Sequence, residues 1–83
     1  MKITLRFFSS LREQLGLSVQ EYETFAMNVA QLRSELMLLN LNYAQALASG
    51  KAIRVAVNQE VCEDNALLSE GCEVAFFPPV TGG

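Results

Sequence analysis

The fold is decided by the stretch NVAQLRSELMLL at residues 28–39. Asn28 followed by Gln31 matches a capping box, so a helix is expected to begin just after Asn28. The apolar residues that follow recur at offsets typical of one helix face, and they are Val29, Leu32, Leu36 and Leu39. We predict that this segment is the main helix of the domain.

Two strand patterns precede this helix. Residues 2–8 alternate, with one face carrying Ile3, Leu5 and Phe7 and the other carrying Lys2, Thr4, Arg6 and Phe8. Such alternation is typical of a half-buried strand. Residues 17–25 combine Val, Tyr, Thr and Phe with Glu21 and Glu23, which indicates a charged edge strand.

A short helix is expected between these two strands. Ser10 and Glu13 have the spacing of a capping box, Leu11 and Leu15 lie one turn apart, and Gly16 can end the helix in the left-handed conformation. The sequence therefore predicts a one-to-two-turn helix within the first strand connection.

Further elements follow the main helix. Residues 43–48 predict a helical turn or two, anchored by Leu47 and closing at Gly50. Residues 53–57 alternate as a strand, and the pair Asn58-Gln59 predicts a tight turn before Val61. A second turn is expected at Glu70-Gly71, before a final strand in which Val74 and Phe76 alternate with Ala75 and Phe77.

The resulting order, β-β-α-β-β, favours an α+β domain with the main helix across one face of a mixed sheet. This is the β-grasp, or ubiquitin-like, pattern. We expect residues 1–77 to form the domain and residues 78–83 to form an extended, mobile tail.

In a β-grasp sheet the first and last strands are parallel central neighbours, so Phe8 and Phe77 should share the solvent face. Val61 is a possible third member of an apolar patch there, and such a patch is typical of a protein-protein site. An equally weighted alternative is that the end of the first strand twists and Phe8 covers the edge of the core.

Composition excludes several functions. The 83 residues suit one domain, and a net charge of −3 without a basic run argues against nucleic-acid binding. We expect no membrane span or signal peptide, and hence a cytoplasmic protein. The chain has no His, which argues against a metal site and against catalysis by this chain alone. Cys62 and Cys72 are expected to be buried, reduced thiols.

The tail reads FFPPVTGG at residues 76–83. Pro78 and Pro79 fix the backbone and hold the exit extended, and six residues can reach about 20 Å. Gly82 and Gly83 lack side chains, so they could pass through a narrow channel and present a terminal carboxyl group to a buried reactant. If that carboxylate became an acyl-adenylate, a sulfur donor could convert it to a thiocarboxylate.

The alternative is that the glycines are an uninformative frayed end. Two terminal glycines occur by chance in about one chain in 200. We prefer the functional interpretation because the glycines follow a proline pair and a β-grasp order.

The ending EVAFFPPVTGG at residues 73–83 resembles the small subunits of molybdopterin synthases. The resemblance spans nearly the whole chain and includes Phe7-Phe8, Leu11-Arg12-Glu13 and the segment AVNQ at residues 56–59. It departs at Cys72, where an acidic residue is common in the family, and Cys62 follows the docking position.

By this resemblance, the chain is a ubiquitin-like sulfur carrier. Gly83 would be adenylated by an E1-like partner enzyme that uses ATP, and then converted to a thiocarboxylate by a sulfur donor protein. The carrier would bind the large synthase subunit in a heterotetramer and deliver sulfur to cyclic pyranopterin monophosphate, forming the dithiolene of molybdopterin. The implied docking residues are Phe8, Val61, Phe77, Pro78, Pro79, Val80, Thr81 and Gly82.

Three alternatives stay open at this point. A sulfur carrier of the thiamine pathway would also end in Gly-Gly, although the Phe-Phe-Pro-Pro approach favours molybdopterin. A protein modifier would join Gly83 to a lysine of its target. A plain binding module would use only its sheet face.

Overall fold

The computed structural model describes residues 1–48 and 52–79. The elements, in chain order, are β1 (Lys2–Phe7), α1 (Ser9–Leu15), β2 (Val19–Glu23), α2 (Val29–Leu39), α3 (Leu41–Ala46), β3 (Arg54–Val57), β4 (Glu60–Cys62) and β5 (Glu73–Phe77). The predicted β-β-α-β-β order, with a short helix in the first strand connection and another after the main helix, is confirmed except that β4 adds a strand after β3.

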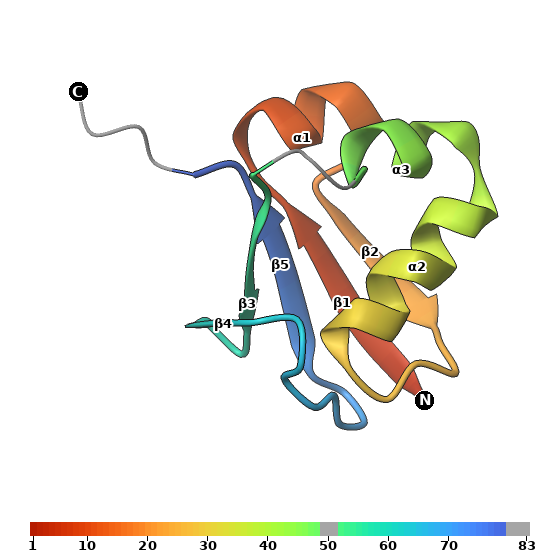
Figure 1. Cartoon of the computed structure of the whole chain (residues 1–83), viewed down its shortest axis with the longest axis vertical. Helices are drawn as coiled ribbons and strands as arrows, with labels where there is room; N and C mark the ends of the chain where they lie inside the picture. Colours follow the sequence, from red (N-terminus) through yellow and green to blue (C-terminus); the bar gives the residue numbers. More distant parts are fainter. Residues whose placement is uncertain (49–51, 80–83) are drawn as a thin grey trace.

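The strands form one mixed sheet in the order β2-β1-β5-β3-β4. β1 and β5 pair in parallel near its centre, while the β1–β2, β3–β5 and β3–β4 pairs are antiparallel. The helices gather on one side of the sheet (Figure 1). This is the expected β-grasp arrangement, and it leaves the opposite face of the sheet open.

The core lies between the sheet and the helices. The inward faces of β1 and β5 bring Phe7 and Phe76 together as cross-strand partners, with ring centroids 6.0 Å apart. From α2, the side chains of Val29, Leu32 and Leu36 are fully buried against this layer. The alternation seen in the sequence therefore sorts each strand into an inner and an outer face.

The main helix begins where the sequence predicts. The side chain of Asn28 accepts a hydrogen bond from the Gln31 N–H at 2.8 Å, and the Gln31 side chain accepts one from the Met27 N–H at 2.8 Å. The first contact satisfies a backbone donor that the helix start leaves unpaired, and the second satisfies the N–H of the residue before the cap. The N-terminal cap of α2 is thus reciprocal, with its second contact one residue before the cap.

The capping box predicted at Ser10 and Glu13 is wrong. α1 begins at Ser9, its N-cap is Phe8, and no side-chain hydrogen bond caps it. The cause is the strand: the Phe8 N–H still pairs with the Phe76 carbonyl, and Ser9 turns the backbone with φ at 55°. The end of α1 is as predicted, because Gly16 takes φ 75° and donates to the Arg12 carbonyl.

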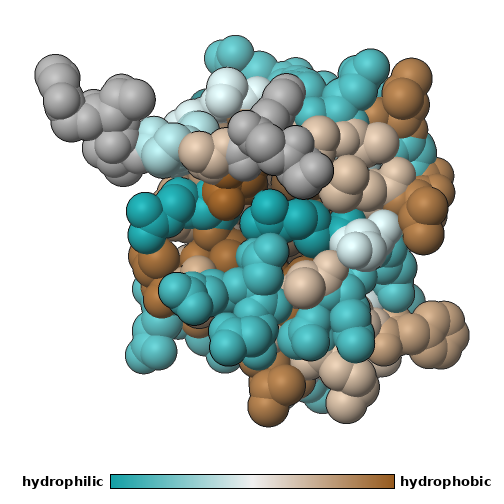
Figure 2. Space-filling view, viewed as in Figure 1, coloured by the Kyte–Doolittle hydropathy of each residue, from teal (hydrophilic) through white to brown (hydrophobic). Residues whose placement is uncertain are grey.

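Leu39 is not on the buried face of the main helix, as its spacing predicted. It is the last residue of α2 and is 55% exposed, because Asn40 ends this helix and caps α3 through the Tyr43 N–H. Leu38 and Leu41 are also exposed, and apolar side chains lie at the surface around the α2–α3 junction (Figure 2). Leu47 is fully buried as expected, while Gly50 falls outside the described residues.

The two predicted turns are confirmed. Asn58 and Gln59 have φ of 51° and 70°, so the β3–β4 hairpin has two left-handed residues, as the turns that suit twisted strands require. Gly71 has φ 80° and leads into β5. The second strand is an edge strand, as its two glutamates indicated.

Glu35 ties α2 to the segment that follows β2. Its carboxylate accepts hydrogen bonds from the Tyr22 hydroxyl at 2.8 Å, the Thr24 hydroxyl at 2.6 Å and the Phe25 N–H at 3.2 Å. Burial, together with this hydrogen bond to Glu35, raises the pKa of Tyr22 to about 12. These hydrogen bonds fix the position of α2 relative to the end of β2, on the side of the sheet that carries the helices.

None of the helices in residues 1–48 and 52–79 has both the length and the hydrophobicity needed to cross a bilayer.

Candidate docking groove and the start of the tail

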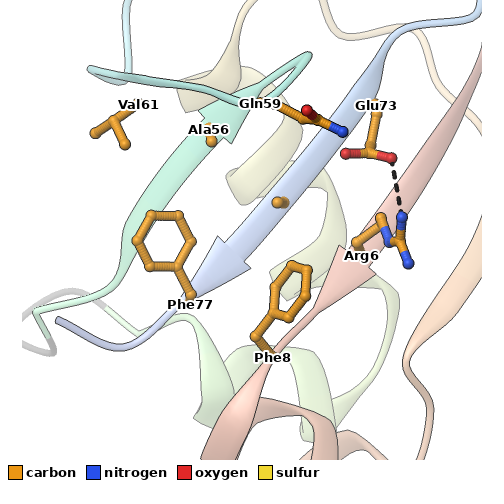
Figure 3. A pocket seen from close by; sticks show the side chains of 8 residues that line it. Arg6, Phe8, Ala56, Gln59, Val61, Glu73 and Phe77 are labelled. Atoms are coloured by element: carbon orange, nitrogen blue, oxygen red, sulfur yellow. Dashed lines mark hydrogen bonds and ion pairs between the residues drawn. The ribbon is translucent and has the colours of Figure 1, made fainter. Parts of the chain in front are cut away.

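A groove of about 400 Å³ lies on the open face of the sheet. Phe8, Val61 and Phe77 provide large apolar walls, and Arg6, Gln59 and Glu73 provide polar ones (Figure 3). Its floor is made by Ala56 and Ala75, which face each other across the β3–β5 pair. Because alanine carries only a methyl group, the larger neighbouring side chains leave a hollow above it.

Strand register brings these residues together. One row across the open face joins Arg6, Ala75, Ala56 and Val61 through successive pairs of strands. Phe77 lies two residues after Ala75 on the same face of β5. Phe8 lies two residues after Arg6, and its N–H continues the pairing with β5.

Phe8 stays on the open face because the backbone turns immediately after it. Phe8 keeps extended dihedral angles of φ −125° and ψ 157° while serving as the N-cap of α1. The left-handed Ser9 then redirects the chain into the helix. Phe8 is 42% exposed and lines the groove, so it does not cover the edge of the core, and the alternative interpretation is wrong.

Arg6 and Glu73 form the polar side of the groove. Arg6 Nη1 lies 3.3 Å from Glu73 Oε2, and the Arg6 guanidinium carbon lies 5.9 Å from the centroid of the Phe8 ring. The Glu73 backbone N–H is held by Asn58 Oδ1 at 3.0 Å. The ion pair and the cation–π contact connect β1, β5 and the rim of the groove.

The structure therefore places three predicted docking residues, Phe8, Val61 and Phe77, around one groove. Pro78 is partly buried and Pro79 is exposed, and both follow directly from β5. The remaining predicted tail residues, Val80, Thr81, Gly82 and Gly83, lie outside the described residues. The start of the predicted tail therefore directly follows the strand that carries the groove residue Phe77.

Sequence reasoning missed five lining residues: Arg6, Ala56, Gln59, Glu73 and Ala75. Arg6 was placed on the correct face by alternation, but nothing in the sequence pairs it with a residue 67 positions away. The sequence did contain one signal of a groove. Ala56 and Ala75 are small residues at outward-facing strand positions, and such residues leave a hollow between larger neighbours.

The two cysteines are free thiols. Cys72 is in the core at 3% exposure, and Cys62 is partly buried on the inner side of β4. Burial raises the pKa of the Cys62 thiol, which keeps it protonated at neutral pH. Within the described segments, His, Cys, Asp and Glu do not gather in groups of three that could hold a metal ion.

Comparisons with a protein-family model and with individual proteins match nearly the whole chain. The model of the ThiS family matches residues 5–83. The chain is 40% identical over 81 residues to the molybdopterin synthase sulfur carrier subunit of Escherichia coli (strain K12), covering 98% of this chain and 99% of that protein. It is 35% identical, with the same coverage, to the protein of that name from Haemophilus influenzae.

Among solved structures, the chain resembles one in a protein-protein complex of subunits 1 and 2 of molybdopterin-converting factor from Helicobacter pylori 26695. The TM-score is 0.70 at 24% identity, and the match covers 100% of both chains. At this identity the likeness establishes a shared fold.

Proposed function

The chain belongs to the ThiS family, and we propose that it is the sulfur carrier subunit of a molybdopterin synthase. Two bacterial relatives with this function align with almost the entire chain. The structural observation that carries the proposal is that the predicted tail starts at Pro78, directly after the groove residue Phe77, with which β5 ends. A partner seated on the groove would therefore also receive the tail.

The proposed reacting group is the C-terminal carboxylate of Gly83. An E1-like enzyme with bound ATP would form the acyl-adenylate and release pyrophosphate. A sulfur donor protein would then supply sulfide-level sulfur, whose attack on the acyl carbon breaks the bond to AMP and leaves a thiocarboxylate. This activation belongs to the partner, because the chain has no His to act as a general base near neutral pH.

The proposed acceptor is cyclic pyranopterin monophosphate, held by the large synthase subunit. Residues 77–83 would enter that subunit, with Pro78 and Pro79 keeping the arm extended and Gly82 allowing a narrow approach. We propose a heterotetramer in the cytoplasm, with the large subunit binding Phe8, Val61 and Phe77. The fold shared with a chain of the two-subunit Helicobacter pylori complex supports this choice of partner.

Deletion of Gly83 tests the proposal. The shortened chain should bind the large subunit but form no molybdopterin in a reconstituted assay with the activating enzyme, ATP and a sulfur donor. The matched control, Lys2→Met, alters the same sheet outside the groove and should retain activity. Product formed by the shortened chain at the rate of the full chain would refute the proposal.

Intact mass spectrometry of the native protein separates the alternative functions. A sulfur carrier shows the mass change expected when one oxygen of its terminal carboxylate is replaced by sulfur. A protein modifier would instead appear in high-mass conjugates through Gly83. A carrier of the thiamine pathway would acquire sulfur but would not support molybdopterin formation with the large subunit.

A further inference from the structure

The hydrogen-bonding capacity of Arg6 is mostly unused. Its guanidinium group makes one side-chain hydrogen bond, from Nη1 to Glu73 at a long 3.3 Å. Its Nε is buried and has no hydrogen-bond partner among the residues that the structure describes. An arginine offers five N–H donors in a planar fork, so the observed arrangement satisfies only a small part of this group.

The unsatisfied N–H donors of Arg6 lie where a docking partner would cover them. Its side chain is 41% exposed, it lines the groove, and it lies over the Phe8 ring. In Figure 3 the Arg6 guanidinium group lies beside Glu73, on the opposite side of the lining residues from Val61. A protein that covers Phe8 must therefore also cover Arg6 and remove water from its free donors. Burying such donors without an acceptor is unfavourable.

The charges around the groove indicate which acceptor fits. Glu73 is the acidic side chain that lines the groove, and Arg6 already engages it. Arg54 is exposed on β3 as the cross-strand partner of Phe77, and it makes no ion pair within the described part of the chain. The Phe8–Phe77 end of the groove is therefore locally positive, although the whole chain carries −3. A carboxylate complements this end best.

We propose that Arg6 is a specificity-determining residue of the groove, which donates a pair of hydrogen bonds to a carboxylate on the large synthase subunit. The partner surface then consists of an apolar side chain that fills the space between Phe8, Val61 and Phe77, with an Asp or Glu beside it. On docking, the guanidinium group exchanges its single long contact with Glu73 for a paired contact with the partner. This inference rests on the proposed function, because it specifies the partner of the same site.

Binding measurements with the purified large subunit test this inference. Arg6→Met removes the charge but keeps an unbranched apolar stem against Phe8, and it should weaken binding at least about 10-fold. Lys2→Met is the matched control, because Lys2 lies on the same face of β1 outside the groove and pairs with Glu21. It should change the affinity by less than about twofold. Binding of the unaltered chain should also depend more steeply on salt than binding of Arg6→Met.

Two further variants separate a contact with the partner from a structural role. Glu73→Gln removes the internal ion pair, and under the proposal binding tightens, because the guanidinium group no longer gives up one carboxylate to bind another. If Arg6 only braced the groove through Glu73, this variant would weaken binding as much as Arg6→Met. Arg6→Lys keeps a point charge without the planar fork, so it should recover only part of the lost affinity. Full recovery would refute the paired hydrogen bonds.

The outcomes distinguish this inference from the proposed function. If the unaltered chain does not bind the large subunit, the proposed function fails. If it binds and Arg6→Met matches Lys2→Met in affinity and salt dependence, the role of Arg6 is refuted while the carrier function stands. Circular dichroism melts of every variant provide the check that the sheet is folded.

Discussion

Replacement of Glu35 should expose how the main helix is fixed to the sheet. The Tyr22 and Thr24 hydroxyls both donate to Oε1 of this carboxylate, and the Phe25 N–H donates to Oε2. In Glu35→Ala all three contacts are lost. Tyr22 and Phe25 lie near the surface and can turn to water, but Thr24 is only 3% exposed and its hydroxyl proton loses its acceptor.

The free energies follow from this difference in exposure. A buried donor left without a partner costs about 1–3 kcal/mol, and a hydrogen bond that water can replace costs about 1 kcal/mol or less. Glu35→Ala should therefore lower the free energy of unfolding by about 3 kcal/mol. Glu35→Gln should cost only about 1 kcal/mol, because its amide oxygen can still accept from Tyr22 and Thr24 while its NH₂ faces the Phe25 N–H.

The dependence on pH gives a second, independent readout. Burial acts to raise the pKa of Glu35, but the hydrogen bonds from Thr24, Tyr22 and the Phe25 N–H prevail and lower it from the ordinary value of 4.5. A lowered pKa in the folded state means that the contribution of the carboxylate is fully present above pH 4.5. It is lost as the pH falls through the lowered pKa. Glu35→Gln has no such titration.

Urea unfolding followed by circular dichroism, at pH values from neutral to about 3, measures both effects. The stability difference between the unaltered chain and Glu35→Gln should be largest at neutral pH and should shrink in acid. A difference that stayed constant over this range would refute the argument from the carboxylate. So would a Glu35→Ala variant within about 0.5 kcal/mol of the unaltered chain at neutral pH.

Three further predictions concern the core, the hairpin and the thiols. Leu36→Ala should lose about 2–5 kcal/mol because Leu36 is fully buried, whereas Leu38→Ala, at an 89% exposed position, should stay within about 0.5 kcal/mol in the same urea titration. Gln59→Gly should gain about 1 kcal/mol, seen as a higher melting temperature, because Gln59 has φ 70° and only glycine adopts this region without cost. A destabilised Gln59→Gly would show that the side chain contributes more than the turn costs. Cys62, whose pKa is raised by burial, and Cys72, at 3% exposure, should react with a disulfide reagent at neutral pH at least about 10-fold more slowly in the folded chain than in urea.

The sequence was sufficient for features that depend on local periodicity. Alternation in residues 2–8 assigned Phe8 to the solvent face, and the strand order placed it beside Phe77. The start of α2 followed from Asn28 and Gln31, whose backbone and side-chain contacts lie within one turn. Each of these inferences requires only the chain's own spacing and the handedness of its elements.

Features that depend on register or on helix rotation were not predictable. Arg6 meets Glu73 only because β1 and β5 pair with one particular offset. Glu35 reaches Thr24 only because α2 turns one side of its surface toward the end of β2. The error at Ser10 has a related cause, since pairing of Phe8 with β5 moved the start of α1 toward the strand.

The sequence pairs Phe7-Phe8 and Phe76-Phe77 link the positions of the groove residues to the packing of the core. Phe7 and Phe76 are cross-strand partners on the inner face, stacked at 6.0 Å, so the parallel register of β1 and β5 is fixed by buried aromatic packing. A slip of one residue would exchange the faces of the strand and expose a buried ring. Because Phe8 and Phe77 are the next residues along these strands, the register that buries the inner rings also sets the outer ones around the groove. The same register positions Pro78, where the predicted tail starts. The stacking of Phe7 on Phe76 in the core therefore sets the positions of both the proposed docking surface and the start of the proposed delivery arm.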